Sequence, residues 1–201
     1  MMPPGGREVE RTPEDLNREF YLEWKKTGGM ESVCRQDEEI PFWRKIVFNA
    51  FASFGGLDDF ESYFSIIYQS FTLKENWRVF EDVAESGILE KLKRRGVALG
   101  VVSNWDSRLP LILSNMGLAH YFVFILASTV VGSAKPDEKI FKEALRLSKT
   151  KAGETCHIGD EPRADFRGAR DLGIKSILVD RTGKHQDADL RPKISSFLEL
   201  A

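Results

Sequence analysis

The chain has 201 residues, of which 42% are hydrophobic and 30% charged, so its composition excludes a long disordered chain, a collagen-like chain and a disulfide scaffold. Its 29 Lys and Arg residues nearly balance 31 Asp and Glu residues, and a net charge of −2 argues against nucleic acid or an anionic membrane as a partner. No apolar run of about 18 residues occurs. Two distant cysteines, Cys34 and Cys156, suit a reducing compartment, so we expect a cytoplasmic protein.

Helical patterns dominate the first 74 residues. Thr12, Pro13 and the acids that follow form a helix start, and further apolar stripes predict helices over 38–54 and 58–71. We therefore expect an all-helical unit over 12–74, preceded by a disordered or weakly ordered N-terminus over 1–11. Its aromatic residues at helical spacing are interpreted as core.

The pattern changes after residue 75. Short apolar runs at 97–102, 123–127, 155–159 and 176–179 alternate with helical patterns near 85–95, 107–116, 137–148 and 162–172. Apolar runs without polar alternation are typical of parallel strands covered on both faces. The second half, 75–201, is therefore predicted to be an α/β, Rossmann-like, doubly wound parallel sheet.

Polar side chains follow three of these runs. In doubly wound sheets ligands bind beyond the carboxyl ends of the strands, so these residues are the candidate site. They are Ser103 and Asn104 after the first run, Lys135 after the second, and Asp160, Glu161 and Asp165 after the third.

This set of residues suits phosphoryl chemistry. Asp160 is a candidate ligand of Mg²⁺, a hard cation that takes oxygen ligands, with Glu161 as a secondary candidate; Asp165 is expected either to bind the metal through water or to orient Lys135. Lys135 is expected to stabilise phosphoryl oxygens, and Ser103 with the amide of Asn104 to hold one of them.

Taken singly, these residues have simpler interpretations. Ser103 alone is better explained as a helix cap, Asp160 alone equally well as a helix cap, and Lys135 alone better as a solvated loop lysine. His157 lies inside an apolar run and is interpreted as a packed or hydrogen-bonded strand histidine rather than a catalytic one.

Three segments resemble motifs two, three and four of the haloacid dehalogenase-like hydrolase superfamily. They are Val101-Val102-Ser103-Asn104, Lys135-Pro136-Asp137, and Gly159-Asp160 with Asp165, followed by Gly168-Ala169-Arg170. The resemblance spans about 77–180. It implies a Rossmann-like core with a helical cap, Mg²⁺ as cofactor, a small phosphorylated substrate, and an attacking aspartate that becomes an aspartyl-phosphate.

The chain departs from the family at the first motif, an Asp-x-Asp at the end of an apolar first strand. Nothing in 1–11 matches it. Asp187-Ala188-Asp189 and Asp15-Leu16-Asn17 have related spacings, but neither follows an apolar strand, so neither is favoured as the nucleophile. We expect a core without its usual first strand, whose place is taken by an upstream segment, by Arg7-Glu8-Val9-Glu10, or by a strand-pairing partner or second copy.

Three functions remain open on this reading. The leading one is a Mg²⁺-dependent phosphatase in a form that lacks the nucleophilic aspartate. A catalytically inactive binding or scaffold protein is the alternative from another class. A haloacid dehalogenase is less favoured, because it works without Mg²⁺ and the acidic cluster favours a cation site.

Overall fold

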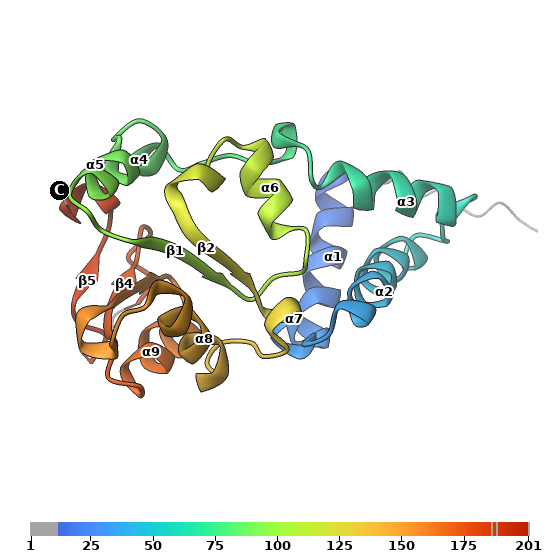
Figure 1. Cartoon of the computed structure of the whole chain (residues 1–201). Helices are drawn as coiled ribbons and strands as arrows, with labels where there is room; N and C mark the ends of the chain where they lie inside the picture. Colours follow the sequence, from blue (N-terminus) through green and yellow to red (C-terminus); the bar gives the residue numbers. More distant parts are fainter. Residues whose placement is uncertain (1–11, 186, 188, 201) are drawn as a thin grey trace, which may run out of the picture.

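The computed structural model describes residues 12–185, 187 and 189–200. The expectations for 1–11, including the stretch Arg7-Glu8-Val9-Glu10, lie outside the described residues. Figure 1 shows helices α1, α2 and α3 at one end of the molecule and the strands with their covering helices at the other. We call the first region the helical unit (13–70) and the second the α/β half (81–200).

The helical unit follows the predicted apolar stripes. Helix α1 (Pro13–Thr27) begins where the Thr12 side chain accepts a hydrogen bond from the Asp15 main-chain N–H, and it ends at Gly28, whose φ of 78° is left-handed. Helices α2 (Glu39–Ala52) and α3 (Phe60–Ser70) follow, after two 3-10 turns at Gly29–Ser32 and Gln36–Glu38.

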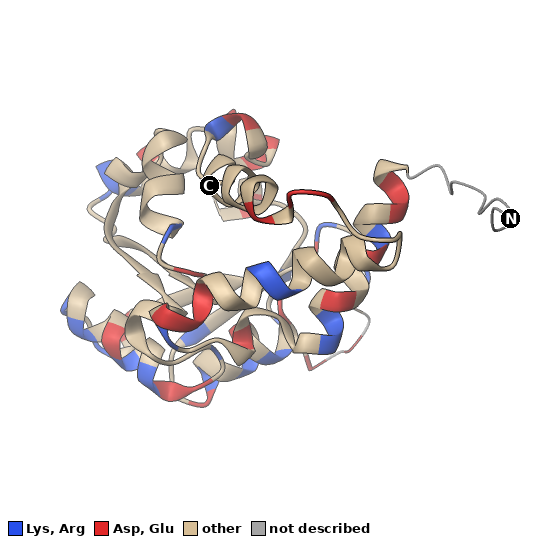
Figure 2. Cartoon of the chain, turned by 90° about the vertical axis from the view of Figure 1, so that its right-hand side faces the viewer, with Lys and Arg blue, Asp and Glu red and all other residues tan. Residues whose placement is uncertain are grey.

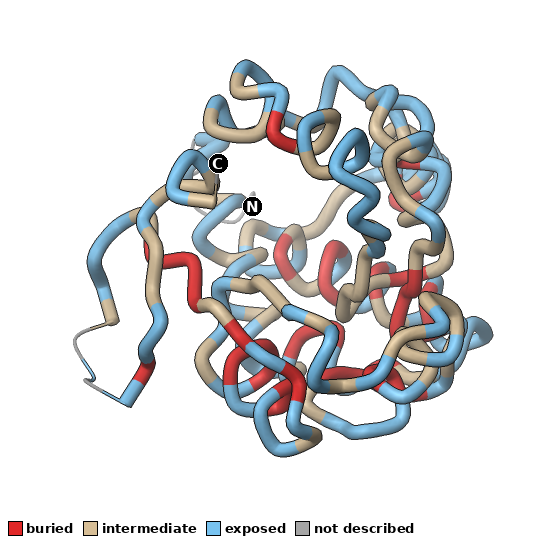
Figure 3. Tube along the Cα trace, turned by 60° about the vertical axis from the view of Figure 1, so that its left-hand side comes forward, coloured by how far each residue is buried: buried red, intermediate tan, exposed pale blue. Residues whose placement is uncertain are grey.

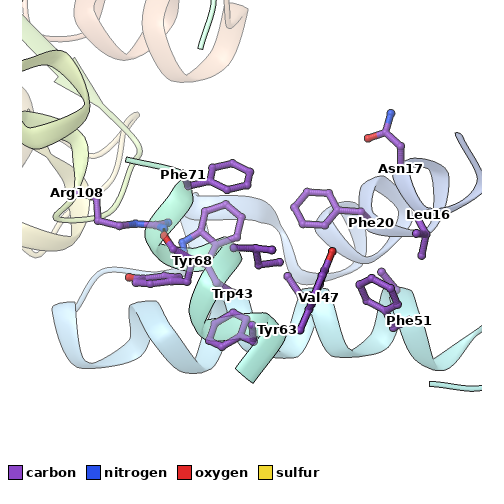
Figure 4. A pocket seen from close by; sticks show the side chains of 13 residues that line it. Leu16, Asn17, Phe20, Trp43, Val47, Phe51, Tyr63, Tyr68, Phe71 and Arg108 are labelled. Carbon is purple, nitrogen blue, oxygen red and sulfur yellow. Dashed lines mark hydrogen bonds between the residues drawn. The ribbon is translucent and has the colours of Figure 1, made fainter. Parts of the chain in front are cut away.

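Aromatic side chains form the core of the helical unit. Trp24 and Trp43 stack with ring centroids 5.3 Å apart, and Phe60 stacks on Phe64 at 6.0 Å. Beside this core lies an aromatic pocket of about 290 Å³ between α1, α2 and α3, with Arg108 at one end (Figure 4). Of the four aromatics interpreted as core, Trp43 is buried, Trp24 and Phe51 are partly buried against the core, and Phe71 is exposed, so the interpretation is confirmed for Trp43 and wrong for Phe71.

A connecting segment joins the helical unit to the first strand. It contains a 3-10 turn, Lys74–Asn76, and the short helices α4 (Glu81–Ala84) and α5 (Ile88–Arg94). The helix predicted near 85–95 is therefore α5, and it is separated from α4 by Gly87, whose φ of 63° interrupts the helical path.

All strand pairs in the α/β half are parallel. Strand β1 (Leu99–Ser103) pairs with β2 (Phe122–Ala127), and β3 (Cys156–Gly159) pairs with β4 (Lys175–Val179), which in turn pairs with β5 (Lys193–Ile194). The α/β fold with parallel strands and covering helices is as predicted.

The single sheet that the sequence predicts is divided in two. Within the described residues β1 and β2 form one sheet and β3, β4 and β5 form another, so β1 and β3 each leave one edge without a strand. No residue of β1 or β3 is buried, whereas β2 and β4 each contain buried residues. Strand β2 also has a strand on one edge only, yet its last two residues are buried, so the number of neighbouring strands alone does not determine burial.

Helices lie on both sides of the strands (Figure 1). Helices α5 and α6 (Leu109–Asn115) lie on one side of β1 and β2, and α8 (Glu138–Ser148) lies on the other. The short helix α7 (Ser128–Val131), which sequence reasoning did not anticipate, follows β2 directly.

The helix expected over 162–172 is wrong in type. Residues Pro162–Arg167 form a π-helical turn, and only α9 (Gly168–Arg170) is α-helical. The carbonyl of Glu161 accepts from the main-chain N–H of both Asp165 and Phe166, which widens this turn by one residue. Such turns carry no distinct hydrophobic period, so sequence periodicity does not reveal them.

The surface agrees with the charge balance. In the view of Figure 2, Lys and Arg segments are interspersed with Asp and Glu segments. Buried segments in Figure 3 run beside exposed outer loops, and one buried cluster consists of Ile140, Phe141, Ala169 and Ile174. Among the described residues no helix combines the length and apolar character needed to cross a bilayer.

Candidate functional site

Strand β1 ends at Ser103, and the loop after it supplies the first two predicted site residues. Within the described part of the chain the Ser103 hydroxyl makes no hydrogen bond, so it remains available to a ligand. The side chain of Asn104 is occupied: its Oδ1 accepts from the Lys135 main-chain N–H at 2.7 Å, and its Nδ2 donates to the Lys135 carbonyl at 2.9 Å. Asn104 therefore clamps the backbone of Lys135.

Lys135 lies between the two sheets. Its Nζ donates to the main-chain carbonyl of Val102 at 2.8 Å and to Asp165 Oδ1 at 2.6 Å, and the residue is only 9% exposed. Val102 immediately precedes Ser103, so the ammonium group lies at the same strand end as the free hydroxyl. One cation thus joins an open edge of β1 to the segment that follows β3.

The carboxylate of Asp165 is held by three donors. Oδ1 accepts from Lys135 and from His157 Nε2 at 2.9 Å, and Oδ2 accepts from the Glu161 main-chain N–H at 3.1 Å. Burial alone would raise the pKa of Asp165, but the hydrogen bond from His157 and the charge of Lys135 outweigh it and hold this pKa well below its usual range. Asp165 is therefore an ionised anchor for Lys135.

The side chains of Asp160 and Glu161 take no part in this anchor. Both residues are exposed, and the side chain of neither makes a hydrogen bond or ion pair within the described residues. Nor do the described residues contain a cluster of three or more His, Cys, Asp or Glu side chains arranged to hold a metal ion. The three acidic residues singled out in the sequence thus differ. Three donors hydrogen-bond to the carboxylate of Asp165, whereas the side chains of Asp160 and Glu161 make no hydrogen bond or ion pair within the described residues.

The two carboxylate patterns that the sequence analysis set aside lie elsewhere. Asp15 contacts Thr12 and Arg18 in the first turn of α1. Asp187 pairs with Arg167 in a loop after β4. Neither carboxylate lies at a strand end.

A buried polar network joins the helical unit to the loop that follows β1. Glu39, at the start of α2, is 4% exposed, and its carboxylate accepts from the main-chain N–H of Ser107 at 2.8 Å, from the Ser107 hydroxyl at 2.6 Å and from the Thr129 hydroxyl. These donors belong to the loop after β1 and to α7. The helical unit is therefore anchored to the loop that carries Ser103.

A second buried carboxylate, that of Asp106, also joins the loop after β1 to the helical unit. Asp106 is fully buried and accepts from the indole N–H of Trp43 at 2.7 Å and from the guanidinium of Arg108. Arg108 also donates to the Tyr68 carbonyl at 2.7 Å and lies over the Tyr68 ring. The charge of Arg108 is thereby balanced at the end of the aromatic pocket (Figure 4).

Sequence reasoning missed three functional contacts: the Asn104 clamp and the roles of Glu39 and Asp106. The hydrogen bond of His157 in β3 agrees with the expected packed or hydrogen-bonded strand histidine. Asp106 had a signal in the sequence, because the run Asp106-Ser107-Arg108 lies shortly after the strand end. Glu39 had none, because its partners are 68 and 90 residues away.

The Lys135 ammonium lies at the carboxyl end of β1, where the Ser103 hydroxyl makes no hydrogen bond within the described residues. Fixed positive charge next to a hydroxyl donor suits a phosphoryl group, because both stabilise negative oxygens without reorganising.

Comparison with known proteins identifies the family. The family described as haloacid dehalogenase-like hydrolase matches residues 36–179. The chain therefore belongs to the haloacid dehalogenase-like hydrolase family.

Individual relatives carry the same description. The chain is 41% identical over 113 residues to the haloacid dehalogenase-like hydrolase domain-containing protein 3 of Bos taurus, covering 56% of this chain and 44% of the relative. It is 34% identical over 171 residues to the Mus musculus protein of that name, covering 84% and 67%. The match thus spans from under half to two thirds of these relatives.

Two further matches bear on chemistry and fold. A phosphoserine phosphatase of Thermus thermophilus is 36% identical over 107 residues, which cover 53% of this chain and 43% of that protein. The crystal structure of a 2-haloacid dehalogenase from Pseudomonas syringae pv. Tomato superposes with a TM-score of 0.65 at 27% identity, covering 96% of this chain and 80% of that one.

Proposed function

We propose that this hydrolase acts as a phosphatase on a small phosphorylated molecule. The carrying observation is the Lys135 ammonium, which is held at the carboxyl end of β1 by Val102 and Asp165, next to the free hydroxyl of Ser103. In this proposal Lys135 and Ser103 bind phosphoryl oxygens, and the Asn104 clamp keeps Lys135 in place. The likeness to a phosphoserine phosphatase supports the same class of substrate.

We propose Mg²⁺ as the cofactor, with Asp160 as its ligand and Glu161 beside it. Mg²⁺ keeps several waters and needs only one or two protein carboxylates together with the substrate phosphate, so this donor set fits. When bound, the ion neutralises phosphoryl charge. Asp165 is assigned to Lys135 rather than to the ion, because three donors already occupy its oxygens.

The helical unit is proposed as the cap of this site. The Glu39 carboxylate binds the loop after β1, and Trp43 binds Asp106 in the same loop. A movement of the helical unit would therefore shift the loop that follows Ser103. We extend this cap to residues 12–74 and the core to 75–201. A cytoplasmic location is supported by the two free cysteines, Cys34 and Cys156.

The proposed reaction also needs an attacking carboxylate. No described carboxylate contacts Ser103 or Lys135 other than Asp165, which is already committed. We propose that the nucleophile of the family reaction enters on a strand that pairs with the open edges of β1 and β3, supplied by an upstream segment or by a partner chain.

A non-catalytic binding protein is the second candidate. One observation favours it: Lys135 already bridges the two sheets through Val102 and Asp165, so the described residues hold together around the gap without a nucleophile. The dehalogenase alternative is supported by the likeness to the Pseudomonas syringae structure, whereas the free carboxylates Asp160 and Glu161 favour a cation-dependent reaction.

Hydrolysis of an aryl phosphate by the purified protein, with and without Mg²⁺, tests the proposal. Mg²⁺-dependent activity that Asp160→Asn abolishes, and that Asp171→Asn at an exposed carboxylate leaves unchanged, would support the phosphatase and show that a carboxylate of this chain replaces the missing aspartate. Absence of activity in a cooperatively folded sample would favour either the binding protein or a nucleophile supplied from outside the 201 residues.

Strand pairing needs a separate measurement. Hydrogen exchange of the amides of β1 and β3, followed at increasing protein concentration, should show rising protection if a second copy fills the gap. Unchanged exchange would exclude the second copy and leave an upstream segment or a different partner chain.

A further inference from the structure

His157 has no role in the proposed chemistry, but its side chain contacts Asp165, the residue that anchors Lys135. It lies in β3, its side chain is 14% exposed, and its Nε2 is 2.9 Å from Asp165 Oδ1. An ionised carboxylate only accepts hydrogen bonds, so Nε2 carries the proton and donates it. The imidazole meets the buried ring of Phe141 edge to face, with centroids 5.3 Å apart, which fixes the plane of the donor.

The backbone of β3 makes room for this contact. Gly159 shares the strand face of His157, and a Cβ built there would lie 2.2 Å from Cγ of Asp165. Any larger residue at 159 would displace the carboxylate. His157 thus supplies a donor, and Gly159 supplies the space in which Asp165 receives it.

The contact continues to the ammonium group. Oδ1 of Asp165 accepts both from His157 Nε2 and from Lys135 Nζ, so one oxygen atom links the imidazole to the cation. Its other oxygen accepts from a single main-chain N–H, that of Glu161. Without His157 the carboxylate would keep one fixed oxygen and lose the constraint on the oxygen that Lys135 uses.

We propose that His157 is a positioning residue: through Asp165 it fixes where the Lys135 ammonium lies beside Ser103. The inference rests on the proposed function insofar as Lys135 binds phosphate. The role of His157 in controlling the position and accessibility of the Lys135 amine does not depend on any catalysis.

Two substitutions separate donation from packing. Gln places its Nε2 the same number of bonds from Cβ as the Nε2 of histidine, so His157→Gln can still donate to Asp165, whereas His157→Leu fills similar space without a donor. His120→Leu is the matched control, because His120 is exposed and contacts Tyr121, away from the site. Thermal unfolding of each variant shows whether it is folded.

Two readouts are measured on the full chain. Titration with inorganic phosphate should give about tenfold weaker binding for His157→Leu, the size expected for losing one charged hydrogen bond, with His157→Gln close to wild type. Trinitrobenzenesulfonate labelling followed by peptide mass spectrometry should show faster modification of Lys135 in His157→Leu than in wild type or His157→Gln.

The outcomes distinguish this inference from the phosphatase proposal. Wild-type binding and labelling in folded His157→Leu would overturn the role of His157 and leave the phosphatase proposal intact. If wild-type protein does not bind phosphate, the phosphate site fails, and the Lys135 labelling rates alone decide the role of His157.

A measurement on wild-type protein covers the case in which His157→Leu does not fold. The ¹⁵N spectrum of the imidazole should show the tautomer protonated at Nε2, and Asp165→Asn should alter it. A tautomer protonated only at Nδ1 would overturn the proposal.

Discussion

The helical unit and the α/β half are held together by different interactions. In the helical unit, stacked and buried aromatic residues from α2 and α3 form the core, although α1 itself buries no residue completely. In the α/β half, the strands that face each other across the gap, β1 and β3, contain no buried residue. A lysine bridge rather than strand pairing joins them.

This difference teaches what a parallel sheet needs. Strand β2 lies beside β1 and contains buried residues, and β4 lies beside β3 and does so too. In the three-stranded sheet the central strand β4 contains buried residues and the edge strand β3 does not, whereas β2 is buried at its last two residues although it is an edge strand, because α7 and α8 pack against it. A buried ion pair that crosses such a gap depends on geometry and charge, whereas aromatic packing depends mainly on area removed from water.

The largest effect is expected in the aromatic core. Phe60→Ala should lower the free energy of unfolding by about 3 to 5 kcal/mol, because Phe60 is buried and stacks on Phe64. Phe48→Ala, on an exposed ring that meets Phe60 edge to face, should cost about 1 kcal/mol. Urea unfolding measures both. Equal losses would mean that the helical unit is not held by its buried aromatics.

The next effect tests the bridge. Lys135→Met should lower the free energy of unfolding by about 3 kcal/mol, because it leaves the carboxylate of Asp165 buried without its cation. Lys142→Met, which breaks an exposed pair with Glu138, should change it by less than about 0.5 kcal/mol. If both variants unfold like wild type in urea, the bridge does not hold the sheets together.

Acid should weaken the α/β half selectively, and by less than loss of the lysine. The pKa of Asp165 is lower in the folded than in the unfolded protein, so its contribution is fully present above the unfolded pKa of about 4 and is lost as pH falls further. Unfolding in urea at pH 7 and at pH 3 should show a smaller acid loss for Asp165→Asn than for wild type. An identical loss would place the acid-sensitive group elsewhere.

The smallest effect concerns the start of the helical unit. Thr12→Ala removes the acceptor for the Asp15 N–H and should cost about 1 kcal/mol, seen as reduced amide protection in the first turn of α1. Thr12→Ser keeps the acceptor and should restore protection. Loss of protection in both variants would mean that the cap does not act through its hydroxyl.

Much of the fold was predictable from local patterns. The apolar runs at 97–102 and 123–127 became β1 and β2 within two residues, and the stripe at 137–148 became α8. The candidate residues also follow the strands as predicted. Their placement at strand ends was accessible because strand and helix periods are properties of neighbouring residues.

The contacts of the site were less accessible. The clamp between Asn104 and Lys135 joins residues 31 apart, and the bond from Glu39 to Thr129 joins residues 90 apart. The π-helical turn after Glu161 also escaped prediction, and it determines where Asp165 lies. Such contacts depend on how distant segments pack, which no local period encodes.

The sequence by itself determined the order of strands and helices, the family motifs and the residue types available at the strand ends, because these depend on local spacing and side-chain chemistry. Only the tertiary structure decided that the strands form two sheets, that Asp165 anchors Lys135 while Asp160 stays free, and that His157 completes the anchor. The physical reason is that hydrogen-bond partners and burial are set by which distant segments meet in space.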